Sequence, residues 1–99
     1  MKTTITEQEN AVVATLDGRL DTAASPQTET ELQALLDANK DIILDCTKME
    51  YISSSGLRIF LGILKKAKPS GKHVYIKGLN NDVRNVFNIT GFISLFEYM

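Results

Sequence analysis

Residues 45–57, Asp-Cys-Thr-Lys-Met-Glu-Tyr-Ile-Ser-Ser-Ser-Gly-Leu, join two segments of different character. The apolar run 42–44 before them predicts a buried strand, and the pattern from Leu57 onward predicts a helix. Ser53, Ser54 and Ser55 therefore lie on a strand-to-helix loop. The first amides of a helix have no internal acceptor and carry the positive end of its dipole, so this loop suits a switch or an anion site. The alternative, that one serine is merely an N-cap, explains one hydroxyl but not three.

The N-terminal part of the chain predicts a hairpin at the edge of a sheet. Residues 3–7 and 11–16 are short runs with β-branched residues, separated by a polar turn. Asp17-Gly18 is a hairpin signal, yet the residues after it are too few for a return strand. We therefore expect a glycine bulge that extends the second strand.

A helix is expected from Pro26 to about Ala38, because Ser25-Pro26 supplies an N-cap and a proline at the first helical position. Its buried stripe should be Leu32, Leu35, Leu36 and Ala38. Its solvent-facing side should hold Gln27, Thr28, Glu31 and Gln33.

A central strand is expected over residues 41–45, buried on both faces because its apolar residues are consecutive. Asp45 at its end is either an acceptor that organises the following loop or an acid near the serines. Cys46 is expected in the core as a small, inert residue.

The next helix is predicted over residues 57–68 and is apolar over a wide arc. Ile59 and Ile63 lie at the margin of that arc, where they either meet a neighbouring helix or form an exposed patch. Gly62 lies on the opposite side, which suggests either a surface that something approaches closely or a neutral substitution.

The C-terminal third predicts a strand at 74–76 and a last helix with an N-cap at Asn80 or Asn81 and a C-cap at Gly91. Four apolar residues should complete the core: Phe92, Ile93, Leu95 and Phe96. The predicted fold is α/β: a small single domain over residues 1–99, with a mixed sheet, helices packed on it, and the order ββαβαβα plus a short terminal strand.

Composition excludes several classes of function. The chain has 99 residues, of which 43% are hydrophobic and 23% charged, and lacks a membrane span or a signal peptide, so we expect a cytoplasmic protein without membrane insertion. One cysteine, Cys46, and one histidine, His73, provide no metal-ligand spacing, so we expect no metal, and His73 is expected to be a strand-end residue rather than a base.

Charge is divided unevenly along the chain. Residues 1–50 carry a formal charge of −6 and residues 51–99 of +5. The lysines of 65–72 suit the negative end of a helix dipole and have no aromatic residues among them, so no nucleic-acid binding is expected.

The serines do not match the motifs of catalytic serines or of phosphate-binding loops. A nucleophile elbow has glycines two residues either side of its serine, and a P-loop ends in Gly-Lys-Ser/Thr; neither occurs here. We therefore expect a protein that is not an enzyme and whose serines receive a phosphoryl group rather than transfer one.

The chain resembles the STAS domain family, within it the bacterial anti-sigma-factor antagonists. The resemblance covers nearly the whole chain and rests on residues 16–21, on 43–45 followed by 51–52, and most specifically on Ser54-Ser55-Gly56-Leu57. It implies that Ser55, immediately before the glycine, is phosphorylated by a partner kinase, with Ser54 as the alternative acceptor. Family members usually carry Asp where this chain has Ser53.

The resemblance implies a protein–protein switch. Unphosphorylated, the chain would bind a serine-kinase anti-sigma factor; phosphorylated, it would release it, and a serine phosphatase would reset it. No cofactor is expected for the chain itself. The expected partner surface comprises Arg19, Asp21, Ser53, Ser54, Gly56, Arg58 and Gly62. The alternatives are an accessory subunit of a lipid or anion transport system, or a nucleotide-binding module.

Overall fold

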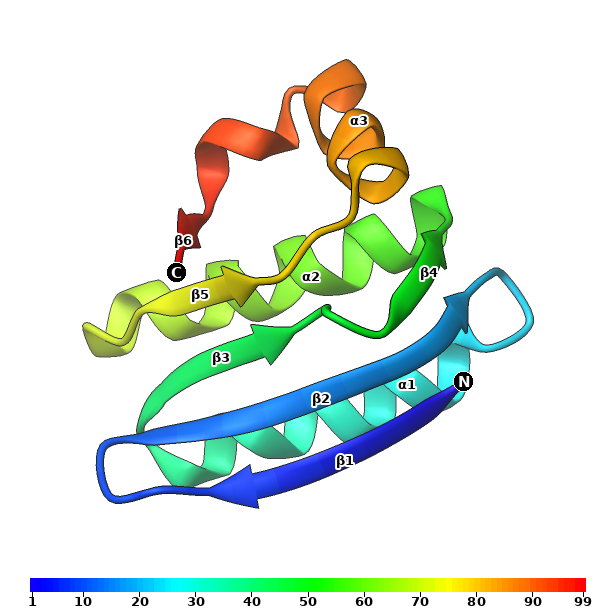
Figure 1. The fold of residues 1–99 in the computed structure, drawn as a ribbon. Helices are drawn as coiled ribbons and strands as arrows, with labels where there is room; N and C mark the ends of the chain where they lie inside the picture. The colour runs from blue at the N-terminus through cyan, green and yellow to red at the C-terminus, as the bar shows by residue number, and fades with distance from the viewer.

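The N-terminal hairpin forms one edge of a six-stranded mixed sheet in the computed structural model, which describes residues 1–99 (Figure 1). Strand β1 (Lys2–Glu7) pairs antiparallel with β2 (Ala11–Leu20), as predicted. Strands β3 (Asp41–Asp45), β5 (Val74–Lys77) and β6 (Glu97–Tyr98) follow in parallel, in the order β1-β2-β3-β5-β6. The predicted α/β class with a mixed sheet is confirmed.

Strand β2 continues through Gly18, as predicted, but the extra residue at the irregularity there is Glu50 of the partner strand rather than a residue of β2. Gly18 has a φ of +112°, which favours glycine, and the register shifts between Gly18 and Arg19. From Gly18 onward β2 pairs with β4 (Met49–Ile52), a strand that the sequence did not predict. Residues 45–57 are therefore not one long loop: β4 interrupts them and brings the serines to the end of β2.

Helix α1 (Ser25–Gln33) continues as a 3₁₀ turn to Ala38 and ends at Asn39, close to the predicted bounds. The predicted cap is wrong: Ala24 is the N-cap, and the Ser25 hydroxyl instead donates a hydrogen bond to the carbonyl of Asp21 at 2.8 Å. Thr28, expected in solvent, is also buried. Ser25 and Thr28 extend the stripe of Leu32, because residues at i, i+3 and i+7 share one helix face.

Helix α2 (Ser54–Ala67) begins before Leu57 and runs on into a 3₁₀ turn over Lys68–Ser70. It lies beside α1 on the same face of the sheet (Figure 1). Ile59 and Ile63 are buried, so they do not form the exposed patch that was the alternative, and Ile59 lies beside Ser25 and Pro26 of α1.

Helix α3 (Asn81–Thr90) is attached at both ends by predicted residues. The Asn80 side chain accepts from the Val83 amide at 2.8 Å as the N-cap, and its Nδ2 donates to the Met49 carbonyl of β4 at 2.9 Å. Gly91, with a φ of +77°, ends the helix. The chain then returns through a short turn over Phe92–Leu95 to β6.

Three aromatic rings hold α3 and the returning chain against α2. Phe60, Phe87 and Phe96 lie with ring centroids 6.0–6.5 Å apart in tilted or edge-on orientations, which are the favourable ones. All three belong to the core.

Only one face of the sheet is covered by helices, and the expectation of a central strand buried on both faces is wrong. In β3, Ile42 and Leu44 are buried but Ile43 is partly exposed, and β2 shows the same alternation. Cys46, directly after β3, is completely buried as predicted, and burial raises the pKa of its thiol to about 12.

Two glycines of α2 should respond oppositely to the same substitution. A Cβ at Gly56 would lie 2.8 Å from side-chain atoms of both Leu20 and Ile52, whereas one at Gly62 would meet nothing within 4 Å. Gly56→Ala should lower the free energy of unfolding by about 1–3 kcal/mol through overpacking. Gly62→Ala should raise it by about 0.5–1 kcal/mol through helix propensity. Urea denaturation of both variants checks this, and a neutral Gly56→Ala would contradict it.

Candidate functional site

The candidate site lies where β2 and β4 end and where α1 and α2 begin (Figure 1). The amide of Ser53 donates to the carbonyl of Leu20 at 2.9 Å, so β4 and β2 remain paired up to the first residue of the serine run. Gly56 then packs directly on Leu20 and Ile52. The first turn of α2 is thus fixed on the ends of two strands.

The three serines have different surroundings. Ser53 is only 8% exposed and is the N-cap of α2, where its Oγ accepts from the Gly56 amide at 3.2 Å. Ser54 is exposed and Ser55 is partly exposed, and neither hydroxyl has a hydrogen-bond partner in the protein. The N-cap alternative therefore applies to Ser53, and two serines remain without that role.

The backbone amides of Ser54 and Ser55 precede the first intrahelical bond, which Leu57 donates to the carbonyl of Ser53 at 3.0 Å. These amides have no acceptor within the helix and point toward its N-terminal end. A negative charge on either serine would therefore be favoured by the helix dipole.

Ser55 opens into a hollow of about 250 Å³ between the first turns of α1 and α2. The lining residues are Ser25, Pro26, Glu29, Ser55, Arg58 and Ile59. Arg58 is exposed one turn after Ser55, and Gly62 lies two turns after it, about 10 Å further along the helix. Ser55, Arg58 and Gly62 therefore share one stripe of α2.

Arg19 and Asp21, at the end of β2, have distinct roles. The guanidinium carbon of Arg19 lies 4.4 Å from the centroid of the Tyr51 ring, a cation–π contact across the β2–β4 pair. The carboxylate of Asp21 accepts from the Ala24 amide at 2.9 Å and thereby organises the turn into α1. Tyr51, which is 39% exposed, was not selected from the sequence, because its strand was not predicted.

Two predicted partner-surface residues lie beneath that surface. Ser53 and Gly56 are buried, Ser53 as the cap and Gly56 as the packing point of α2. Arg19, Ser54 and Arg58 are exposed, and Asp21 and Gly62 are partly exposed. The structure thus brings six of the seven residues to the end of the fold where α2 begins, with Gly62 further along that helix; five of the seven are accessible.

Asp45 belongs to a different part of the fold, so its loop-organising role is the one that the structure supports. Its carboxylate accepts from the Thr47 amide at 3.0 Å and from the Thr47 hydroxyl at 2.6 Å. Burial alone would raise the pKa of Asp45, but the two bonds from Thr47, together with Lys77 and Lys48, lower it below its usual value.

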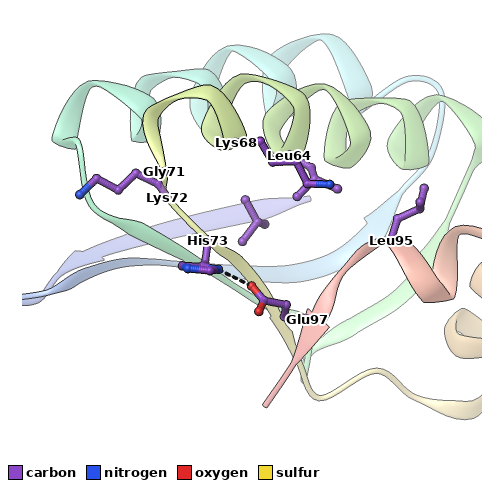
Figure 2. A pocket seen from close by; sticks show the side chains of 8 residues that line it. Leu64, Lys68, Gly71, Lys72, His73, Leu95 and Glu97 are labelled. Atoms are coloured by element: carbon purple, nitrogen blue, oxygen red, sulfur yellow. Dashed lines mark hydrogen bonds and ion pairs between the residues drawn. The ribbon is translucent and has the colours of Figure 1, made fainter.

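The largest hollow, about 480 Å³, lies at the opposite end of α2 from the serines. Figure 2 shows its side chains around the start of β5, where His73 meets Glu97 with Nδ1 and Oε2 2.7 Å apart. His73 is thus a strand-end residue paired across to β6, as predicted, and is remote from Ser55. No group of three or more His, Cys, Asp and Glu side chains is arranged to hold a metal ion, and no helix is long and apolar enough to cross a membrane.

A family model for the STAS domain matches residues 2–98. The chain belongs to the STAS domain family. This STAS domain is 35% identical over 97 residues to BtrV of Bordetella bronchiseptica, a provisionally assigned anti-sigma factor antagonist, covering 97% of this chain and 84% of BtrV. It is 31% identical over 93 residues to the anti-sigma-B factor antagonist of Staphylococcus aureus strain NCTC 8325, covering 93% of this chain and 86% of that protein.

The fold is also that of solved antagonists. The unphosphorylated anti-sigma factor antagonist SpoIIAA superimposes with a TM-score of 0.76 at 20% identity, over 99% of this chain and 87% of SpoIIAA. The phosphorylated form of SpoIIAA, from Bacillus, gives a TM-score of 0.75.

Replacing Ser53 should destabilise the protein more than replacing Ser54, because only Ser53 caps α2. Ser53→Ala should lower the free energy of unfolding by about 1 kcal/mol, because it removes the acceptor of the Gly56 amide. Ser54→Ala, the matched control, should change it by less than about 0.5 kcal/mol, because that hydroxyl makes no bond in the protein. If chemical denaturation shows the same loss of unfolding free energy for both variants, the assignment of Ser53 as the cap is contradicted.

Proposed function

We propose that this STAS domain is an anti-sigma factor antagonist that is switched by phosphorylation of Ser55. It binds a serine-kinase anti-sigma factor while Ser55 is unmodified and releases it once Ser55 carries a phosphate; a serine phosphatase restores the binding form. The observation that carries the proposal is the unbonded, accessible hydroxyl of Ser55 on a fixed helical turn, beside the exposed Arg58. The names of relatives aligned over 93–97% of the chain support it.

Ser55 is the preferred acceptor for structural reasons. A kinase needs a hydroxyl that enters its active site without rearrangement of the substrate. Ser53 is buried and committed to the cap, so its phosphorylation would require the first turn of α2 to open. Ser54 is exposed and remains the alternative, but it does not line the hollow that Ser55 and Arg58 share.

The phosphate acts on the interface rather than on the fold in this proposal. Phosphoserine adds about −1.5 to −2 charges at neutral pH. At the N-terminus of α2 that charge is favourable by about 0.3–1 kcal/mol, so the domain stays folded. Pressed against a partner that fits a neutral hydroxyl, the same charge costs several kcal/mol, which weakens binding at least about a hundredfold.

The proposed partner surface consists of the accessible residues around Ser55. Arg19, Ser54, Arg58 and Gly62 contact the anti-sigma factor, together with the partly exposed edge of Asp21. Ser53 and Gly56 contribute from below by fixing the turn that presents Ser55. The domain is the substrate of the kinase and not itself an enzyme, and it acts in the cytoplasm, where sigma factors work.

The acceptor is tested by mass spectrometry of the protein purified from its own cells and after incubation with the cognate kinase and ATP. Phosphate should appear on Ser55, and Ser55→Ala should remain unlabelled while it binds the kinase permanently. The matched control, Ser54→Ala, should be labelled like the unmodified protein. Full labelling of Ser55→Ala would move the acceptor to Ser54 or Ser53 and contradict the proposal.

The surface is tested by charge reversal at the two ends of α2. Arg58→Glu should weaken binding of the anti-sigma factor about tenfold or more, because it places a negative charge one turn from Ser55. Lys66→Glu, on the last turn and equally exposed, should change the affinity less than about twofold. Calorimetric titration with the purified kinase compares them; equal affinities would locate the interface elsewhere.

A further inference from the structure

A narrow apolar slot lies between β4 and α3, at the same end of the fold as the serines. Its volume is about 70 Å³, and its lining residues are Glu50, Tyr51, Ile52, Asp82, Val83 and Val86. Ile52 and Val83 are almost completely buried and form the floor, whereas Tyr51 and Val86 remain partly accessible. The slot is therefore an accessible apolar surface with room for one slender side chain.

Two carboxylates line the slot and form no ion pair within the protein. Glu50 on β4 and Asp82 on α3 are both exposed. The ion pairs of the protein are Lys40–Glu7 and His73–Glu97, so neither Glu50 nor Asp82 has a cationic side chain within 4 Å. An apolar slot flanked by two unpaired carboxylates is complementary to a side chain with an aliphatic stem and a cationic head.

The apolar wall of the slot continues along α3. Asp82, Val86 and Ile89 follow one another at i, i+4 and i+7 and so lie on one stripe of the helix. Ile89 is 76% exposed, the highest exposure among the large hydrophobic side chains. A single exposed isoleucine is ordinary, but this one extends an apolar surface that already has a charged end.

The slot is continuous with the surface around the serines. Tyr51 forms one wall of the slot, and the guanidinium carbon of Arg19 lies 4.4 Å from the centroid of its ring. Strand β4 leads directly into Ser53. Asn80 bonds the first turn of α3 to Met49, which fixes the two sides of the slot relative to each other. The slot therefore lies next to Arg19, which belongs to the proposed partner surface.

We propose that this slot receives a lysine or arginine side chain of the protein partner, with its stem on Val83 and Val86 and its charge beside Glu50 and Asp82. The inference deepens the proposed function and rests on it for the identity of the partner. It adds a second contact to the serine surface. Arg58 of this chain lies beside Ser55, in a hollow that Glu29 also lines, whereas Glu50 and Asp82 would hold a cation of the partner.

The chemistry of the slot can be tested without the partner. In ¹H–¹⁵N NMR titrations, n-butylammonium and n-butylguanidinium at millimolar concentration should shift the amides of Tyr51, Val83 and Val86. Uncharged n-butanol and anionic butyrate should bind there at least about twofold more weakly, since only the cations can form an exposed ion pair with each carboxylate.

Charge-removing variants give the matched control for these titrations. Glu50→Gln combined with Asp82→Asn preserves the shape of the slot and should abolish the preference for the cations. Glu9→Gln combined with Asp37→Asn, two exposed carboxylates elsewhere with the same change in net charge, should leave it intact. Equal shifts by n-butanol and n-butylammonium, or shifts that the slot variant does not reduce, would overturn the assignment of a cation site.

Binding of the anti-sigma factor distinguishes a failure of this inference from a failure of the proposed function. Glu50→Lys should weaken that binding about tenfold, and Glu9→Lys should not. If Arg58→Glu weakens binding and Glu50→Lys does not, the slot lies outside the interface and this inference fails while the proposed function stands. If no anti-sigma factor binds but the slot selects n-butylammonium, its cation preference is supported and its assignment to this partner is overturned.

Discussion

The contact between Gly56 and the ends of β2 and β4 is the constraint on which the candidate site depends. Any side chain at residue 56 would collide with Leu20 and Ile52, so α2 can approach the sheet this closely only with glycine there. The backbone bond from Ser53 to Leu20 and the cap from Ser53 to Gly56 belong to the same arrangement. Ser55 is therefore positioned by core packing and not by a mobile loop.

A fixed turn limits how the proposed switch can work. The serine surface has one stripe on α2, one cation–π pair across β2 and β4, and one slot beside α3, and each is tied to the core by a hydrogen bond or a buried residue. A modification on such a support changes the charge of the surface and leaves its shape alone. Discrimination by the partner then rests on electrostatics, which are strongest where water is excluded.

The sequence predicted the fold class, the hairpin, the continuation of β2 through Gly18 and most element ends, because these have strong local signals. Each of these signals acts through the backbone of neighbouring residues. They are the paired β-branched runs, Asp-Gly, Pro after Ser, and the Asn and Gly at the ends of α3. The core role of Cys46 and the packing of Ile59 and Ile63 were also predictable, since the apolar arc of α2 is too wide for the sheet alone to cover.

The features that the sequence did not predict depend on contacts between residues far apart in the chain. Met49–Ile52 is short and buries only its two end residues, so it shows no alternation by which β4 could be recognised. Ser25 looked like a cap because of Pro26, but Asp21 supplies the acceptors of that turn instead. Ile43 looked buried because apolar runs are typical of strands covered on both faces, and only the positions of α1 and α2 reveal that one face is open. The slot has no sequence signature, since its walls come from two elements, β4 and α3, that lie far apart in the sequence.

The burial of Cys46 gives the protein an internal reporter. Alkylating reagents attack the thiolate, and a thiol that is fully buried with a pKa of about 12 offers them almost none at neutral pH. Because Cys46 is the single cysteine and lies against the end of β3, its modification requires the core itself to open. The rate of thiol alkylation thus reports how often the core opens, in the unmodified sequence and without any added label.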